Sequence, residues 1–168
     1  YNVKETKPAP GFVLSDKTYK AELKYKDQTT AIVTDSLEIT NKPTTIIIDK
    51  KVTGTEQRLS GVKFEVWNKA MTDDIDAGIA KKDTIMTDKN GQASIERLIP
   101  GTYCIQEVEG IAGYAMDDKI HEFTIDENGK VEGKGEVTIV VENAKTEIAK
   151  TTAISMDTNS HEGITKAE

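Results

Sequence analysis

The stretch that most constrains the fold is YCIQEVEGIAGY, residues 103–114, which alternates like a β-strand and ends in a glycine-containing turn. Tyr103, Ile105 and Glu107 share one parity, so their side chains point to the same face of the strand. An aromatic and an aliphatic side chain indicate that this face is buried. Glu107 is then a carboxyl group inside a core, which is costly unless the group is protonated or has a partner.

The same pattern opens the chain as YNVKETKPAPGF, where Tyr1, Val3 and Glu5 share one parity. Glu5 precedes Glu107 by 102 residues (107 − 5), and Asn41 precedes Asn143 by the same number (143 − 41). Such self-similarity at a fixed period is typical of a tandem array of domains.

The repeat predicts three segments. Residues 1–42 form the C-terminal half of one unit, and residues 44–144 form a complete unit. Residues 145–168 begin a further stalk domain or form a linker. Because the chain starts inside a unit, we expect it to be an excerpt from a longer protein.

The complete unit contains many short segments of period two. Strands are expected over 44–52 and 63–67, and a hairpin over 84–95 is centred on an Asn-Gly turn. A strand over 36–41 ends the partial unit, and its counterpart over 136–143 ends the complete one. Hydrophobic content of 36% and aromatic content of 5% supply thin β-type cores. We therefore predict an all-β sandwich.

Composition excludes several classes of function. A net charge of −7 without a basic cluster argues against nucleic-acid binding. No apolar run approaches membrane-spanning length, and Tyr1 does not begin a signal peptide. The single cysteine, Cys104, permits no intrachain disulfide and no cysteine-based metal site. No spacing typical of a nucleophilic enzyme is present, so we expect no cofactor, no metal and no catalysis on an outside substrate.

Three polar residues of the complete unit fall on apolar parities in separate strands: Lys50, Glu107 and Asn143. A buried lysine loses its proton and becomes a nucleophile, and a carboxyl group in the same pocket keeps its proton and can shuttle protons. Lys50 would then attack the Asn143 side chain, release ammonia and leave an isopeptide bond. The alternative is a buried Lys–Glu salt bridge with an asparagine bystander. Adjacent Lys51 is the nucleophile if the strand register slips.

These residues resemble a known family. YNVKETKPAPGF and YCIQEVEGIAGY are similar to the YxLxExxAPxGY strand of Cna B-type domains, as are IDKKVTG and the terminal VVENAK. These domains of Gram-positive surface proteins and pilins are prealbumin- or transthyretin-like, reverse immunoglobulin sandwiches. The resemblance implies that Lys50, Glu107 and Asn143 are the reactive trio. In the partial unit it implies Glu5 and Asn41, with a lysine that precedes Tyr1.

The tail, TEIAKTTAISMDTNSHEG, resembles the first strand of stalk domains crosslinked by a Thr–Gln ester. The resemblance implies that Thr151 or Thr152 is the ester threonine. A further B-type unit or a plain linker is the alternative.

We therefore predict a structural stalk segment of a cell-wall-anchored Gram-positive adhesin or pilin, stabilised by a self-formed Lys–Asn bond. Its partners are neighbouring repeats of the same chain, and host matrix proteins or sortase would act through other parts of the parent. The bond forms in a single turnover, so the unit is not an enzyme. The alternative is a host-matrix-binding module that uses the acidic excursion over residues 68–83.

Overall fold

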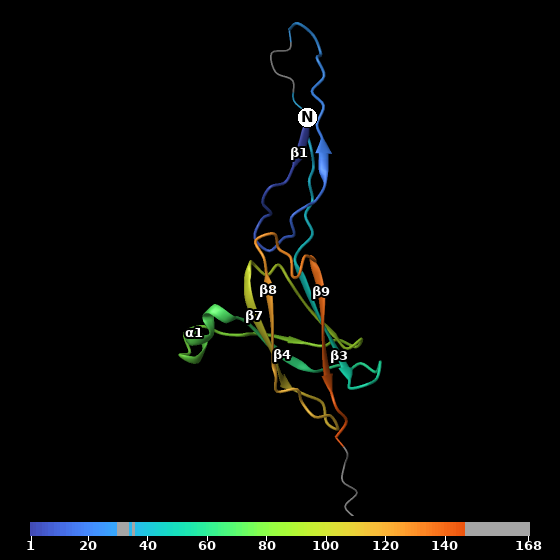
Figure 1. Ribbon diagram of the computed structural model, residues 1–168, viewed down its shortest axis with the longest axis vertical. Helices are drawn as coiled ribbons and strands as arrows, with labels where there is room; N and C mark the ends of the chain where they lie inside the picture. Colours follow the sequence, from blue (N-terminus) through green and yellow to red (C-terminus); the bar gives the residue numbers. More distant parts are fainter. Residues whose placement is uncertain (30–33, 35, 147–168) are drawn as a thin grey trace, which may run out of the picture.

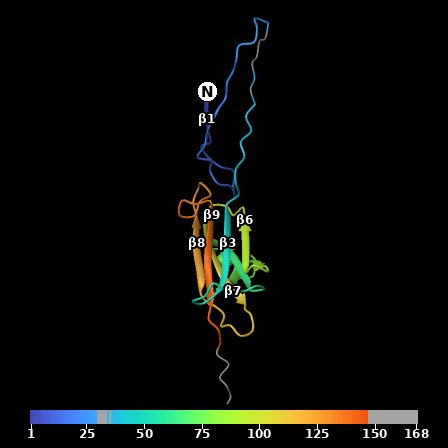
Figure 2. The same ribbon diagram turned by 90° about the vertical axis from the view of Figure 1, so that its right-hand side faces the viewer.

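In the computed structural model, which describes residues 1–29, 34 and 36–146, a sandwich carries an N-terminal segment on one end (Figure 1). The N-terminal segment comprises residues 1–43. The last strand of the sandwich ends at the opposite end, so the chain enters and leaves along the long axis (Figure 2). Among the described residues, no helix is long and apolar enough to span a membrane.

The sandwich consists of two sheets. The three-stranded sheet has the order β6 (Gln92–Glu96), β3 (Thr45–Val52) and β9 (Glu136–Asn143). The four-stranded sheet has the order β5 (Asp83–Met86), β4 (Lys63–Asn68), β7 (Gly101–Glu109) and β8 (Ile120–Ile125). Neighbouring strands pair antiparallel, except that β3 and β9 are parallel.

The core lies between the two sheets and follows the predicted parity. Ile46 and Ile48 of β3 are fully buried against Phe64 of β4 and Ile105 of β7. Alternation of apolar and polar residues along these strands allows one face of each sheet to be buried while the other meets solvent. The all-β sandwich predicted from the sequence is therefore confirmed.

One predicted strand pairing is wrong. The Asn-Gly turn forms as expected, with Gly91 at a φ of 71° and its N–H donating to Asp88 O. However, β5 before the turn pairs with β4, whereas β6 after it pairs with β3 in the other sheet. The turn therefore crosses between the sheets instead of closing a hairpin.

Residues 36–41 do not form the predicted strand. Their counterpart, β9, obtains its ladder from β3 alone, and no strand pairs with residues 36–41 in the part of the chain that the structure describes. An alternating sequence without a ladder partner has nothing to satisfy its backbone donors and acceptors as a strand.

The excursion after β4 contains η1 (Lys69–Met71) and α1 (Thr72–Asp76). Asn68 caps η1 by accepting a hydrogen bond from Ala70 N. At the start of the excursion, Lys69 forms an ion pair with Glu122 of β8, in the four-stranded sheet. These contacts make the excursion part of the folded unit.

The N-terminal segment contains a third sheet, made of β1 (Asn2–Lys4) and β2 (Thr18–Lys20). Its pairing repeats that of β7 with β8 at an offset of 102 residues. Val3 pairs with Tyr19, and Ile105 pairs with His121. The repeat read from the sequence is thus a repeat of strand register.

The N-terminal segment packs closely on the end of the sandwich. Leu14 N donates to Asn128 O at 2.9 Å, and the guanidinium of Arg97 lies 5.6 Å from the ring centroid of Phe12. A side chain at Gly129 would overlap the carbonyl of Phe12. Glycine therefore permits the close approach of two backbones at this junction.

Candidate functional site

The parallel pairing of β3 with β9 brings the first predicted site residues together. Lys50 pairs with Val141, and Val52 pairs with Asn143. Residues of one parity on paired strands face the same side of a sheet. Lys50 and Asn143 consequently both point into the core, and Lys50 Nζ donates a hydrogen bond to Asn143 Oδ1.

Glu107 reaches the same place from the opposite sheet. Its strand, β7, pairs with β4 in the four-stranded sheet, where Glu107 lies opposite Phe64. Glu107 Oε2 lies 2.8 Å from Lys50 Nζ, and Glu107 Oε1 accepts a hydrogen bond from Asn143 Nδ2 at 2.7 Å. Each of the three side chains therefore contacts the other two.

The cluster is closed to solvent. Lys50, Glu107 and Asn143 have relative exposures of 0%, 2% and 1%. The Phe64 ring, whose centroid is 5.9 Å from Lys50 Nζ, forms part of the apolar surroundings. Burial lowers the pKa of Lys50 from its ordinary value, against the opposing effect of the Glu107 carboxyl group. The amine in this site therefore gives up its proton more readily than a lysine in water.

Lys51 lies outside this cluster. It is on the other face of β3, where its Nζ lies 2.7 Å from Glu56 Oε2 and 3.8 Å from Asp49 Oδ2. Of the two adjacent lysines, Lys50 is thus the one within reach of Asn143.

The partial unit repeats two of the three members. Glu5 Oε1 accepts a hydrogen bond from Asn41 Nδ2 at 2.6 Å, as Glu107 does from Asn143. The other oxygen of each carboxyl group accepts a backbone N–H ten residues further along the chain. Ser15 N lies 2.8 Å from Glu5 Oε2, and Asp117 N lies 3.2 Å from Glu107 Oε2.

Comparison with known proteins identifies the fold family. Residues 44–138 match the family of SpaA prealbumin-like fold domains, and this match covers more than half of the chain. The chain belongs to this family. The match includes Lys50 and Glu107 and ends before Asn143. It confirms the prealbumin-like fold predicted from the resemblance to Cna B-type domains.

Solved structures are similar to this chain over different lengths. The Bacillus anthracis TIE protein is 25% identical with a TM-score of 0.50, covering 87% of this chain and 25% of that one. GBS52, the minor pilin of Streptococcus agalactiae, is 26% identical with a TM-score of 0.46, covering 61% of this chain and 44% of that one. A streptococcal ancillary pilin is 22% identical with a TM-score of 0.46, covering 87% of this chain and 41% of that one.

The chain therefore spans between a quarter and less than half of each of these three solved proteins. No curated protein matches the chain.

Within this prealbumin-like chain, the partial site differs from the complete one in its surroundings. Glu5 and Asn41 are only partly buried, and they line an open hollow of about 400 Å³ together with Val3 and Ile39. Ile39 is the counterpart of Val141, the residue that pairs with Lys50 (141 − 102). The hollow thus lies where the register of the prealbumin-like unit would place a lysine.

Two features of the site were not predicted from the sequence: the backbone donors Ser15 and Asp117. A backbone N–H has no residue-type signature, but the repeat offset relates these two positions (117 − 15 = 102). Thr151 and Thr152, the predicted ester residues, lie outside the described residues. Among the residues that the structure describes, no cluster of His, Cys, Asp or Glu could hold a metal ion.

Proposed function

We propose that this chain is a stalk segment of a Gram-positive surface protein whose complete unit forms an isopeptide bond between Lys50 and Asn143. The observation that carries the proposal is the mutual contact of Lys50, Glu107 and Asn143 in a site closed to solvent. In the alternative, a buried salt bridge, Asn143 only satisfies a further donor of the Lys50 ammonium and no bond forms.

The first step is a proton transfer. The Lys50 ammonium gives one proton to Glu107 Oε2 across 2.8 Å. Burial disfavours two separate charges more than a neutral amine and a neutral acid, so it favours this transfer. The product is a nucleophilic amine held against a carboxamide.

The second step forms the bond. Lys50 Nζ attacks the side-chain carbonyl carbon of Asn143, and the bond from that carbon to Nδ2 breaks. Glu107 Oε1 lies 2.7 Å from Nδ2, so the carboxyl group can pass the second proton of Nζ to the leaving nitrogen. One ammonia leaves. The proton first taken by Glu107 departs with it as ammonium, which restores the carboxylate.

The position of the bond suits a stalk. Force applied along the chain enters at the start of β3 and leaves at the end of β9. A bond from Lys50 to Asn143 would carry this force directly and spare the intervening residues. Like a disulfide, it would also restrict the unfolded chain, here across a separation of 93 residues, and it would resist reduction.

We further propose that residues 1–42 and 145–168 belong to neighbouring units of a tandem array. The repeated register of β1 with β2, and the contact of Glu5 with Asn41, support this for the first segment. For the second, the sequence offset gives Thr152 the position of Lys50 (152 − 102), which favours Thr152 over Thr151 as the ester residue. A cell-wall location and sortase anchoring through other parts of a parent protein belong to the same proposal.

Force spectroscopy on the full chain, held at its two ends, tests the mechanical role. Wild type should release no length from the residues between Lys50 and Asn143. Asn143→Ala should release additional length on the order of 300 Å, at about 3.4 Å for each of the 93 residues. Asn41→Ala, the matched control, should behave as wild type. Equal release from wild type and Asn143→Ala would contradict the role.

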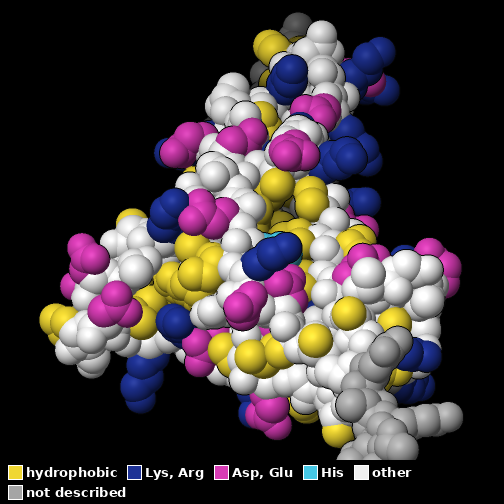
Figure 3. All heavy atoms as spheres, turned by 60° about the horizontal axis from the view of Figure 1, so that its bottom comes forward, with side chains coloured by type: hydrophobic (Ala, Val, Ile, Leu, Met, Phe, Trp, Pro, Cys, Tyr) yellow, Lys and Arg dark blue, Asp and Glu magenta, His cyan; other side chains and the backbone are white. Residues whose placement is uncertain are grey.

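A host-matrix-binding module is the second candidate, and one observation favours it. Apolar side chains surround a hollow of about 250 Å³ between the 68–83 excursion and the sheets, and such side chains gather on this face in Figure 3. The hollow is lined by Trp67, Met71, Ile75, Ile85, Ile95, Leu98 and Ile99, among others. Retention of the chain on immobilised matrix proteins, lost in Met71→Asp, would support this function, and no retention would exclude it for the proteins tested.

A further inference from the structure

The segment that follows β7 packs over the Glu107 carboxyl group. A side chain at Gly110 would come within 3.1 Å of Glu107 Oε1 and 3.6 Å of Met116 Cβ. Asp117 N donates to Glu107 Oε2, the same oxygen that contacts Lys50. The position of this segment therefore sets where the carboxyl group lies between its two partners.

A side-chain pair joins the segment to the next strand, β8. Asp117 Oδ2 lies 2.8 Å from His121 Nε2, and Asp117 Oδ1 accepts the N–H of Lys119 at 3.1 Å. Burial acts to raise the pKa of Asp117, but the hydrogen bonds from His121 and Lys119, together with the nearby charges of His121 and Lys50, hold the pKa below its ordinary value. His121 belongs to β8, which makes the pair an anchor between the segment and the sheet.

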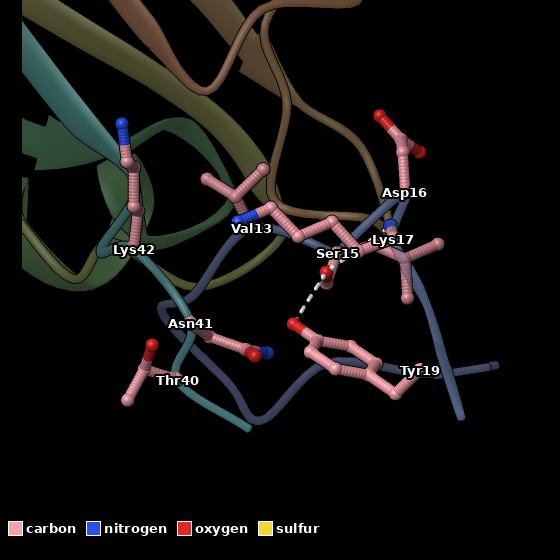
Figure 4. A pocket seen from close by; sticks show the side chains of 9 residues that line it. Val13, Ser15, Asp16, Lys17, Tyr19, Thr40, Asn41 and Lys42 are labelled. Carbon is pink, nitrogen blue, oxygen red and sulfur yellow. Dashed lines mark hydrogen bonds between the residues drawn. The ribbon is translucent and has the colours of Figure 1, made fainter. Parts of the chain in front are cut away.

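The partial unit has an anchor of different chemistry at the same positions. Ser15 and Tyr19 precede Asp117 and His121 by 102 residues, and their hydroxyl oxygens lie 3.4 Å apart. In Figure 4 the Tyr19 ring extends toward Ser15, and Asn41 lines the same pocket. In both units the anchored residue is the one whose backbone N–H binds the carboxyl group. The anchor recurs although its side chains differ.

We propose that Asp117 and His121 are positioning residues for the crosslinking reaction. This inference rests on the proposed function. The pair holds the backbone N–H of Asp117 on Glu107 Oε2, and this contact keeps the carboxyl group between the nucleophile and the leaving nitrogen. The hydrogen bond of His121 goes to Asp117 and not to Lys50 or Asn143, so we expect it to act through the segment.

The rate of ammonia loss tests the proposal. The full chain is synthesised in a cell-free system, samples are quenched at timed intervals, and the intact mass is measured. His121→Ala should slow the loss by roughly ten- to a hundredfold, as a small misplacement of reacting groups does. His121→Gln, which keeps a donor for Asp117, should restore much of the rate. Thermal unfolding of each variant shows whether it folds.

The repeat supplies a sharper variant and a control. Asp117→Ser combined with His121→Tyr installs the anchor of the partial unit and should react faster than His121→Ala. Tyr19→Ala makes the matched change in the partial unit and should react as wild type.

Wild-type rates in a folded His121→Ala variant would overturn the proposal, as would a double variant no faster than His121→Ala. A folded wild type that never loses ammonia would instead refute the proposed function, and this inference with it.

Discussion

Glu5 and Glu107, 102 residues apart in the chain, hold the same kinds of partner. Each accepts a hydrogen bond from an asparagine 36 residues later and from a backbone N–H ten residues later. Only Glu107 also contacts a buried lysine. The chain thus carries one complete and one incomplete copy of the same site, and each copy serves as a control for the other.

Replacement of Glu107 should prevent the bond while the sandwich still folds. Without the carboxyl group Lys50 can remain neutral and hydrogen-bonded to Asn143, so most of the packing survives. Loss of a crosslink across 93 residues should cost roughly 4 to 5 kcal/mol of unfolding free energy. Glu107→Ala should therefore keep the full sequence mass and melt well below wild type in calorimetry.

Glu5→Ala is the matched control for this change. It removes hydrogen bonds from a partly exposed site, which should cost about 1 kcal/mol of unfolding free energy. The chain should still be lighter than its own sequence mass by one ammonia, as in wild type. If Glu107→Ala still lost ammonia, Glu107 would not be the proton shuttle.

Asn143→Ala should give the same loss of stability as Glu107→Ala, because both remove one bond. Effects that act through a single shared interaction are not additive. The double variant should thus unfold at nearly the same denaturant midpoint as either single variant. A double variant destabilised by the sum of the two single effects would show that the residues act separately.

The junction between the N-terminal segment and the sandwich should depend on Gly129. Gly129→Ala places a side chain against the Phe12 carbonyl at a φ of 72°. The variant should loosen the segment, and hydrogen exchange at the Leu14 amide, which binds Asn128 O, should rise. Gly133→Ala introduces the same backbone strain at a φ of 78° with open space around it, so it should leave that exchange unchanged. Equal exchange in both variants would contradict the packing role of Gly129.

Residues 1–42 should not fold by themselves. Tyr1 is 84% exposed, Leu37 is 40% exposed and Val3 is 38% exposed even when the sandwich is attached. So short a segment with these apolar side chains in solvent buries too little surface to offset its conformational entropy. The isolated segment should give poorly dispersed amide signals in an NMR spectrum, and well-dispersed signals would disprove this prediction.

Alternation of polarity predicted the strands that carry the site and the burial of its three side chains. Burial of Lys50 was predictable because it shares a parity with Ile46 and Ile48, and the structure buries all three completely. The same reasoning applied to Glu107 and Asn143. Each of the three is a polar residue at a position where the alternation of its strand predicts an apolar one. This shared feature, on three different strands, is what indicated that they form one site.

Sheet membership was not predictable in the same way. The turn at Gly91 has the same local sequence whether the next strand pairs with its predecessor or crosses to the other sheet. That choice depends on which strands already have partners, which is a property of the whole fold. Residues 36–41 fail for a related reason, because alternation predicts a strand only where a partner strand exists.

The central claim is the covalent bond, and the mass of the folded full chain tests it most directly. We predict that the intact mass is lower than the sequence mass by one ammonia, and that proteolysis yields a linked peptide pair containing Lys50 and Asn143. Asn41→Ala should keep this loss, and Asn143→Ala should abolish it. A folded wild-type chain at the full sequence mass would contradict the account and leave Lys50, Glu107 and Asn143 as a buried polar network without a bond.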